Sequence, residues 1–176
     1  MKKIINSIFL VILIPFLLFF LTQFFLKNGI KINPNIYLIY FAFIVSATNY
    51  KLSYILAFVL GLLEDLLFSN FLGISIFAYI LVFMILNILN NIFKNETKIS
   101  SLIKILIASF VFEITIYLLT MFLSKSPLEI KLFTKILLIE ISMNILLTIV
   151  LYNPLKTFKE NLKGLYSKSN IYTRYF

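Results

Sequence analysis

Long apolar runs separated by short polar breaks dominate this chain and limit what it can fold into. The six runs cover residues 4–26, 36–48, 52–67, 74–93, 102–122 and 132–152. A helix needs about 20 predominantly apolar residues to cross the hydrocarbon core of a bilayer, whereas a helix on the surface of a soluble domain keeps a polar face. The runs therefore predict an all-α integral membrane protein, a bundle of about six transmembrane helices.

Composition supports a membrane protein. Hydrophobic residues make up 61% of the 176 residues and charged residues 13%, against roughly 45–50% and about 25% in soluble domains. The first apolar run follows Lys2 and Lys3 but exceeds the roughly 7–15 residues of a signal-peptide core, and no small-residue cleavage site follows it. We interpret it as the first span.

The chain contains neither cysteine nor histidine. This excludes disulfides, Cys or His catalysis, haem ligation and the common zinc sites, so the sequence predicts no catalytic residue, metal or cofactor. The formal charge of +9 fits cytoplasmic loops and anionic lipid, because membrane proteins concentrate Lys and Arg there. We therefore predict no nucleic-acid partner.

Lysine and arginine also predict the orientation. With six spans and the N-terminus inside, the inner segments carry 11 of these residues and the outer segments 5, as the positive-inside rule requires. We predict a multi-pass membrane protein with both termini in the cytoplasm. The second run is short, so its helix either borrows from residues 30–35 or tilts among its neighbours. Residues 1–153 form the predicted transmembrane domain, and residues 154–176 a basic amphipathic cytoplasmic tail.

The tail alternates apolar side chains with Lys156, Lys159 and Lys163 at roughly helical spacing. Such a helix lies on the inner leaflet, where each lysine contributes roughly 1 kcal/mol through anionic headgroups. An ordinary juxtamembrane tail and a docking helix for a cytoplasmic protein are the other interpretations.

The third run carries small residues at intervals of four, namely Ser53, Ala57 and Gly61, and Asp65 continues the same helical face. Small residues let two backbones approach closely, which is how helices associate in lipid. We predict a helix-packing or partner interface there, with Ala42 and Ser46 on the second helix as one plausible mate. Contact with a ligand is the less favoured interpretation.

Charges within spans are costly, at least about 2.5–3.5 kcal/mol each at mid-depth, and so require partners or a function. The chain has five of them, namely Glu64, Asp65, Glu113, Lys135 and Glu140. In the six-span topology the last turn of the third helix and the first turn of the sixth helix lie at similar depths in the membrane. This predicts an ion pair between Lys135 and Asp65 or Glu64.

Glu113 and Glu140 fall at similar mid-membrane depths on the fifth and sixth helices. We expect at least one of them to be protonated or hydrogen-bonded to Ser109 or Asn144. A path for protons or cations is one interpretation, and helix packing or partner contact is the other.

Residues 54–73 and the apolar helix with Ala78-Tyr79 that follows resemble the signature region of the MreD family of rod shape-determining proteins. The family pattern is a glycine, two aliphatic residues, a variable residue, an aspartate, a short loop and a second glycine. It maps onto Gly61, Leu62, Leu63, Glu64, Asp65 and Gly73. Family members often have Gly or Pro where this chain has Ser69-Asn70-Phe71, so the loop departs from the pattern.

The resemblance implies a non-enzymatic subunit of the bacterial cell-elongation complex, which supports cell shape and peptidoglycan synthesis. Its implied partners are MreC, the glycosyltransferase RodA, a class B penicillin-binding protein and the actin-like MreB at the cytoplasmic face. MreD-like proteins also resemble the six-helix substrate-binding subunits of energy-coupling-factor vitamin transporters, and such a subunit is the alternative function. An intramembrane enzyme acting through Glu64, Asp65, Glu113 or Glu140 is a third and weaker possibility, since no catalytic motif accompanies these residues.

Overall fold

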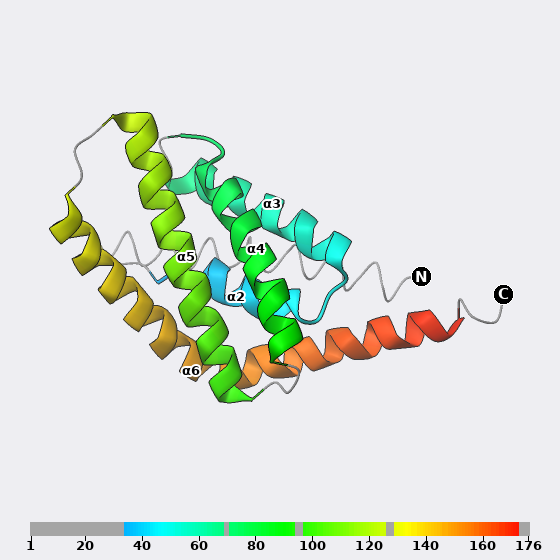
Figure 1. The fold of residues 1–176 in the computed structure, drawn as a ribbon. Coiled ribbons are helices and arrows are strands. Elements are labelled where there is room, and N and C mark those ends of the chain that lie inside the picture. The colour runs from blue at the N-terminus through cyan, green and yellow to red at the C-terminus, as the bar shows by residue number, and fades with distance from the viewer. Residues whose placement is uncertain (1–33, 69–70, 94–96, 126–128, 173–176) are drawn as a thin grey trace.

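The computed structural model describes residues 34–68, 71–93, 97–125 and 129–172, and all regular structure in these ranges is helical. The helices are α2 (Ile36–Val45), α3 (Tyr50–Phe68), α4 (Ile74–Ile92), α5 (Lys98–Ser124) and α6 (Ile130–Tyr172) (Figure 1). The predicted first helix, over residues 4–26, lies outside the described residues. The all-α prediction is confirmed for the part of the chain that the structure describes.

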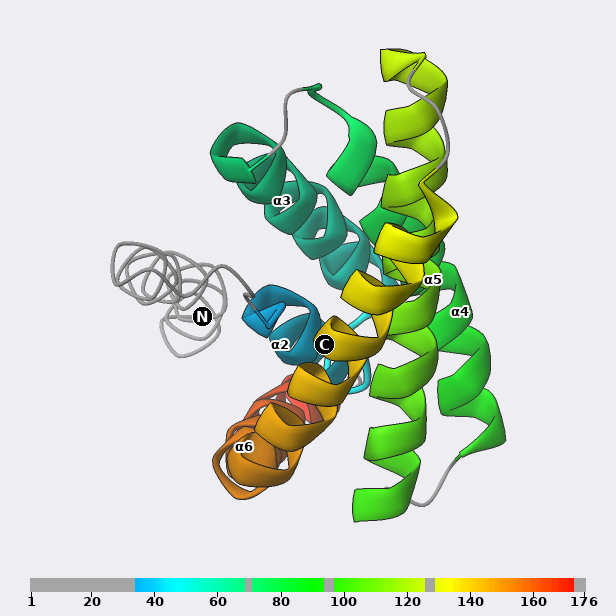
Figure 2. The same ribbon diagram turned by 90° about the vertical axis from the view of Figure 1, so that its left-hand side faces the viewer.

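Helix α2 occupies the middle of the bundle. It contacts the four other helices of the described residues, and Figure 2 shows it end-on with α3, α5 and α6 around it. All ten of its residues are apolar or aromatic and all ten are buried. A helix without a polar face is typically buried. Helix α2 is roughly 15 Å long, which is about half the thickness of the hydrocarbon core of a bilayer.

Three helical segments are long and apolar enough to cross a membrane: α4, α5 and the part of α6 over Ile130–Lys163. Helix α3 also has 19 residues, but it is not among these segments, and it carries the charged residues Lys51, Glu64 and Asp65. Large apolar side chains face outward on several helices, for example Phe122, which is 81% exposed. These features are those of a membrane protein, and the count of six spans remains a prediction.

Helix α5 begins earlier than predicted. Its cap is Thr97, whose hydroxyl accepts a hydrogen bond from the Ser100 backbone N–H, while the Ser100 hydroxyl accepts one from the Thr97 N–H. This reciprocal cap satisfies two N–H groups of the first turn. The apolar run marks only the part of a helix that faces lipid, so it misses this polar first turn.

Helix α6 continues through Pro154 to Tyr172, so the predicted boundary after residue 153 falls inside a helix. Figure 1 shows a change of direction between the yellow and red parts of α6. A proline within a helix removes one backbone hydrogen bond and bends the axis. The division into a transmembrane domain and a tail stays a prediction.

The lysines of the expected tail differ from one another. Lys156 is half-exposed and forms a salt bridge with Glu160 at 3.8 Å. Lys159 is only 4% exposed, so it faces the bundle. The expectation that Lys159 lies on the membrane surface is therefore wrong: α6 bends back along the bundle after Pro154, which turns this face of the helix inward.

Candidate functional site: a polar centre that joins the helices

The predicted small-residue face of α3 packs inside the bundle. Ser53, Ala57, Gly61 and Asp65 are all buried. At Gly61 the backbone of α3 meets the start of α4 so closely that a Cβ atom would lie 2.4 Å from Cα of Ile76. Only glycine permits this approach, which explains why the crossing of α3 and α4 requires that residue.

Asp65 binds the N-terminus of α4. Its carboxylate accepts hydrogen bonds from the backbone N–H groups of Gly73 at 2.7 Å, Ser75 at 2.8 Å and Ile76 at 3.4 Å. Gly73 precedes α4 with a φ of 103°, a conformation that favours glycine. A carboxylate is stabilised at a helix N-terminus by the unpaired N–H groups and the helix dipole, so Asp65 serves as the cap that α4 otherwise lacks.

The predicted ion pair with Lys135 is therefore wrong for Asp65, whose partners are backbone N–H groups. Lys135 is exposed in the second turn of α6, where it lines an open surface hollow together with Glu129 and Lys131. The sequence places two residues at the same depth but does not determine which faces of their helices meet.

Glu64 is not paired with Lys135 either. Its carboxyl group accepts hydrogen bonds from the Tyr79 hydroxyl at 2.8 Å and from Nδ2 of Asn35 at 3.0 Å. Glu64 lies on α3, Tyr79 lies on α4, and Asn35 directly precedes α2. Glu64 and Asp65 lie on different faces of α3 and therefore bind different donors. Asp65 holds α3 to the start of α4, and Glu64 holds it to Tyr79 and Asn35.

Asn35 is the residue on which four helices converge. Its side-chain oxygen caps α2 by accepting a hydrogen bond from the Leu38 N–H at 2.8 Å, and its own backbone N–H donates to Oδ1 of Asn144 on α6 at 2.8 Å. Irregular backbone within a membrane protein must be satisfied by protein groups. This capping explains why α2 begins at Ile36 and does not borrow from the residues before it.

The network extends to α5. Nδ2 of Asn144 donates to the Ser109 hydroxyl at 3.0 Å, and the carboxyl groups of Glu113 on α5 and Glu140 on α6 are close enough to interact electrostatically. Ser109 and Asn144, which the sequence suggested as hydrogen-bond partners of these acids, bind one another. Oε2 of Glu140 is buried without a hydrogen-bond partner.

The polar centre, comprising Asn35, Glu64, Tyr79, Ser109, Glu113, Glu140 and Asn144, thus joins all five described helices. Among the described residues, no group of three acidic residues is arranged to hold a metal ion. The arrangement is one of mutual hydrogen bonding between helices, which is strongly favoured where water is excluded.

Sequence reasoning missed Asn35 and Tyr79. Asn35 stands in Asn33-Pro34-Asn35, which indicates a turn, although asparagine before an apolar run is also a common helix cap. Tyr79 sits in an apolar run, and only its hydroxyl distinguishes it from the phenylalanines around it. A buried tyrosine hydroxyl generally has a partner, but the sequence does not reveal which.

The family comparison gives one result. A family model described as rod shape-determining protein MreD matches residues 1–161. Comparison with curated proteins and with solved structures gives no match. The match spans the region of Gly61, Asp65 and Gly73 and covers most of the chain, so this protein belongs to the MreD family of rod shape-determining membrane proteins.

Proposed function

We propose that this chain acts as a non-enzymatic scaffold in the membrane complex that builds the cell wall during elongation. Membership of the MreD family indicates a role in rod-shape determination. The polar centre supports the scaffold role, because its hydrogen bonds run between helices and hold them together. A rigid bundle of this kind is suited to presenting fixed surfaces to partner proteins.

The partners in this proposal are MreC, RodA, a class B penicillin-binding protein and, at the cytoplasmic face, MreB. Ser53 and Ala57 are buried and Gly61 meets the start of α4, which supports helix packing over partner contact for this face of α3. We place partner contacts on outward-facing apolar side chains instead, and both termini in the cytoplasm. Six spans, with residues 4–26 as the first, complete the topology that we propose.

The alternative of a vitamin-binding transport subunit gains no specific support. Such a subunit requires a pocket with both aromatic and polar walls. The cavity between α2 and α6 holds about 240 Å³, and of the side chains that line it only Tyr40 carries a polar group. We therefore retain the scaffold as the proposed function.

Complementation of a cell depleted of the native protein tests this function. The wild-type chain should restore rod shape, and the Asp65→Ala variant should not, because the start of α4 loses its cap. Lys135→Ala changes an exposed charge and is the matched control, which should restore rod shape fully. Normal rods in cells that lack the protein altogether would contradict the proposal.

A further inference from the structure

An apolar cavity of about 240 Å³ lies between α2 and α6, where α6 bends. Its walls come from α2 and from both sides of the bend, and they include Ile39, Tyr40, Leu151, Pro154, Leu155 and Phe158. Protein interiors contain few voids larger than a water molecule. A space of this size between two packed helices therefore calls for an occupant.

The chemistry of the walls favours hydrocarbon over water. A buried water molecule needs about 2–4 polar partners, whereas Tyr40 is the one lining residue with a polar side chain, and it is only 2% exposed. An apolar cavity of about 150 Å³ stays dry and takes up benzene. The cavity of this protein thus has room for a longer stretch of hydrocarbon.

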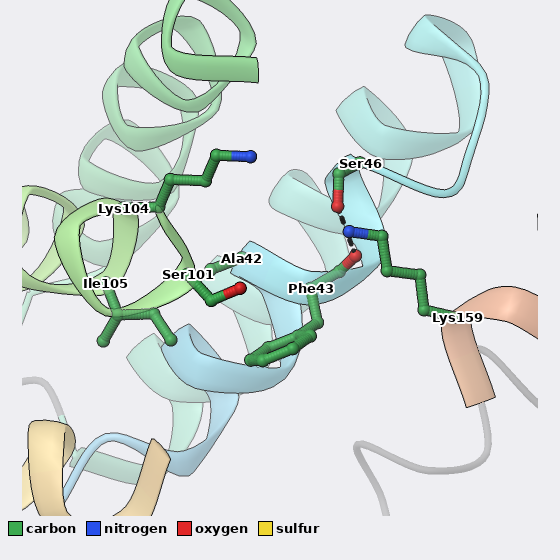
Figure 3. A pocket seen from close by; sticks show the side chains of 7 residues that line it. All are labelled: Ala42, Phe43, Ser46, Ser101, Lys104, Ile105 and Lys159. Atoms are coloured by element: carbon green, nitrogen blue, oxygen red, sulfur yellow. Dashed lines mark hydrogen bonds between the residues drawn. The ribbon is translucent and has the colours of Figure 1, made fainter. Parts of the chain in front are cut away.

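Contacts around the cavity hold the two helices in place. The rings of Phe158 and Tyr40 lie 6.5 Å apart between their centroids, and those of Tyr152 and Phe43 lie 6.1 Å apart. Farther along α6, Lys159 extends to the last turn of α2 (Figure 3). The helices cannot close the cavity by sliding together without disturbing these contacts.

The mouth of the cavity lies on a surface that faces lipid. Pro154 lines the cavity and is exposed. Val150, one helical turn earlier on the same face, is 72% exposed, and Ile149 beside it is 57% exposed. Both belong to the segment of α6 that is long and apolar enough to cross a membrane. The hydrocarbon that this surface meets is that of lipid acyl chains.

We propose that the cavity binds one acyl chain of a membrane lipid, inserted between α2 and α6 at the bend. Lipid is as apolar as the walls, so the preference for the cavity comes from packing contacts that an empty space lacks. The proposal is independent of the scaffold function. A protein segment in the same place, either residues 4–26 of this chain or a second copy, is the outcome that the test must distinguish.

Quenching of tryptophan fluorescence tests the proposal, because the chain contains no tryptophan. The full chain with Phe158→Trp is titrated in neutral detergent with phosphatidylcholine whose acyl chains carry bromine, which quenches tryptophan on contact. Quenching should saturate for this reporter and rise only in proportion to lipid for Val150→Trp, which lies outside the cavity. At low lipid the two should differ about fivefold or more, the ratio that a modest gain in packing contacts gives.

Filling the cavity supplies the matched comparison. Leu151→Phe, added to the Phe158→Trp chain, should remove the saturable quenching because the larger ring occupies the space. Leu138→Phe changes a side chain that is 67% exposed on the same helix and should leave the quenching unchanged. If either cavity variant fails to fold, Leu155→Trp is the second reporter and Ile36→Phe the second filling variant.

Three results would overturn the proposal. Quenching of the cavity reporter that never saturates would mean that it meets only bulk lipid. Absence of quenching would mean that a protein segment covers the cavity. Saturable quenching that survives the filling variant would place the bound lipid elsewhere.

Discussion

At the scale of single residues, Asp65 shows how one acidic side chain determines a helix contact. Its carboxylate binds three backbone N–H groups at the start of α4, where the cap residue Gly73 has no side chain to do so. Glu64, one residue earlier, binds the Tyr79 hydroxyl and the Asn35 amide. Two adjacent acids on different faces of α3 thus fix different neighbours, which gives each a separate prediction.

Replacement of Asp65 by alanine should lower the free energy of unfolding by about 2–4 kcal/mol, because buried N–H groups then lose their acceptor. Asp65→Asn should cost less, since the amide oxygen still accepts one or two of these bonds. Thermal unfolding of purified protein in one detergent measures both variants. An alanine variant as stable as the wild type would show that the cap contributes nothing.

Replacement of Tyr79 by phenylalanine should destabilise the bundle by about 1–3 kcal/mol, because the Glu64 carboxyl group loses a hydrogen-bond donor inside the bundle. Tyr54→Phe is the matched control, as Tyr54 is 45% exposed on α3, and it should change stability by less than about 0.5 kcal/mol. The same unfolding measurement compares the pair. Equal effects would mean that the Tyr79 hydroxyl has no special role.

At the scale of helices, two glycines should fail for different reasons when they are replaced. Gly61→Ala places a Cβ atom 2.4 Å from the Ile76 backbone, so α3 and α4 must move apart. Gly73→Ala meets no atom within 4 Å but must hold a φ of 103°, which costs about 1–2 kcal/mol.

Gly73→Asn should therefore recover part of the stability lost in Gly73→Ala, because asparagine tolerates the left-handed region. Gly61→Ser should recover none, since the clash is with the Cβ atom itself. Unfolding temperatures of the four variants test this. If Gly73→Asn is no more stable than Gly73→Ala, strain at Gly73 is not the cause of its loss.

The helices also show what the sequence can and cannot predict. Apolar runs located α3, α4 and α5 to within a few residues, since the run is a local property. The continuation of α6 through Pro154 was missed, because tertiary packing tolerates a proline bend that local rules treat as an end. The partners of Glu64, Asp65 and Lys135 depend on how helices rotate against one another, and one sequence does not contain that information.

At the scale of the whole molecule, the proposed topology places the end of α5 outside the cell and the far part of α6 inside. The chain contains no cysteine, so single cysteines can be introduced without a background. In intact cells Ser124→Cys should react with a membrane-impermeant maleimide, and Lys163→Cys should react only after permeabilisation. The reverse pattern would invert the topology, and labelling of both sites from outside would show that α6 does not cross the membrane between them.

The membership of this chain in the MreD family leads to one central claim, that it holds other membrane proteins of cell-wall synthesis together. Purification of the tagged protein from its own membrane in mild detergent, with the bound proteins identified by mass spectrometry, tests that claim most directly. The account predicts recovery of MreC together with RodA or a class B penicillin-binding protein, and reduced recovery with Asp65→Ala at equal amounts of folded protein. Recovery of a paired ATPase and a coupling subunit, with none of these partners, would contradict it.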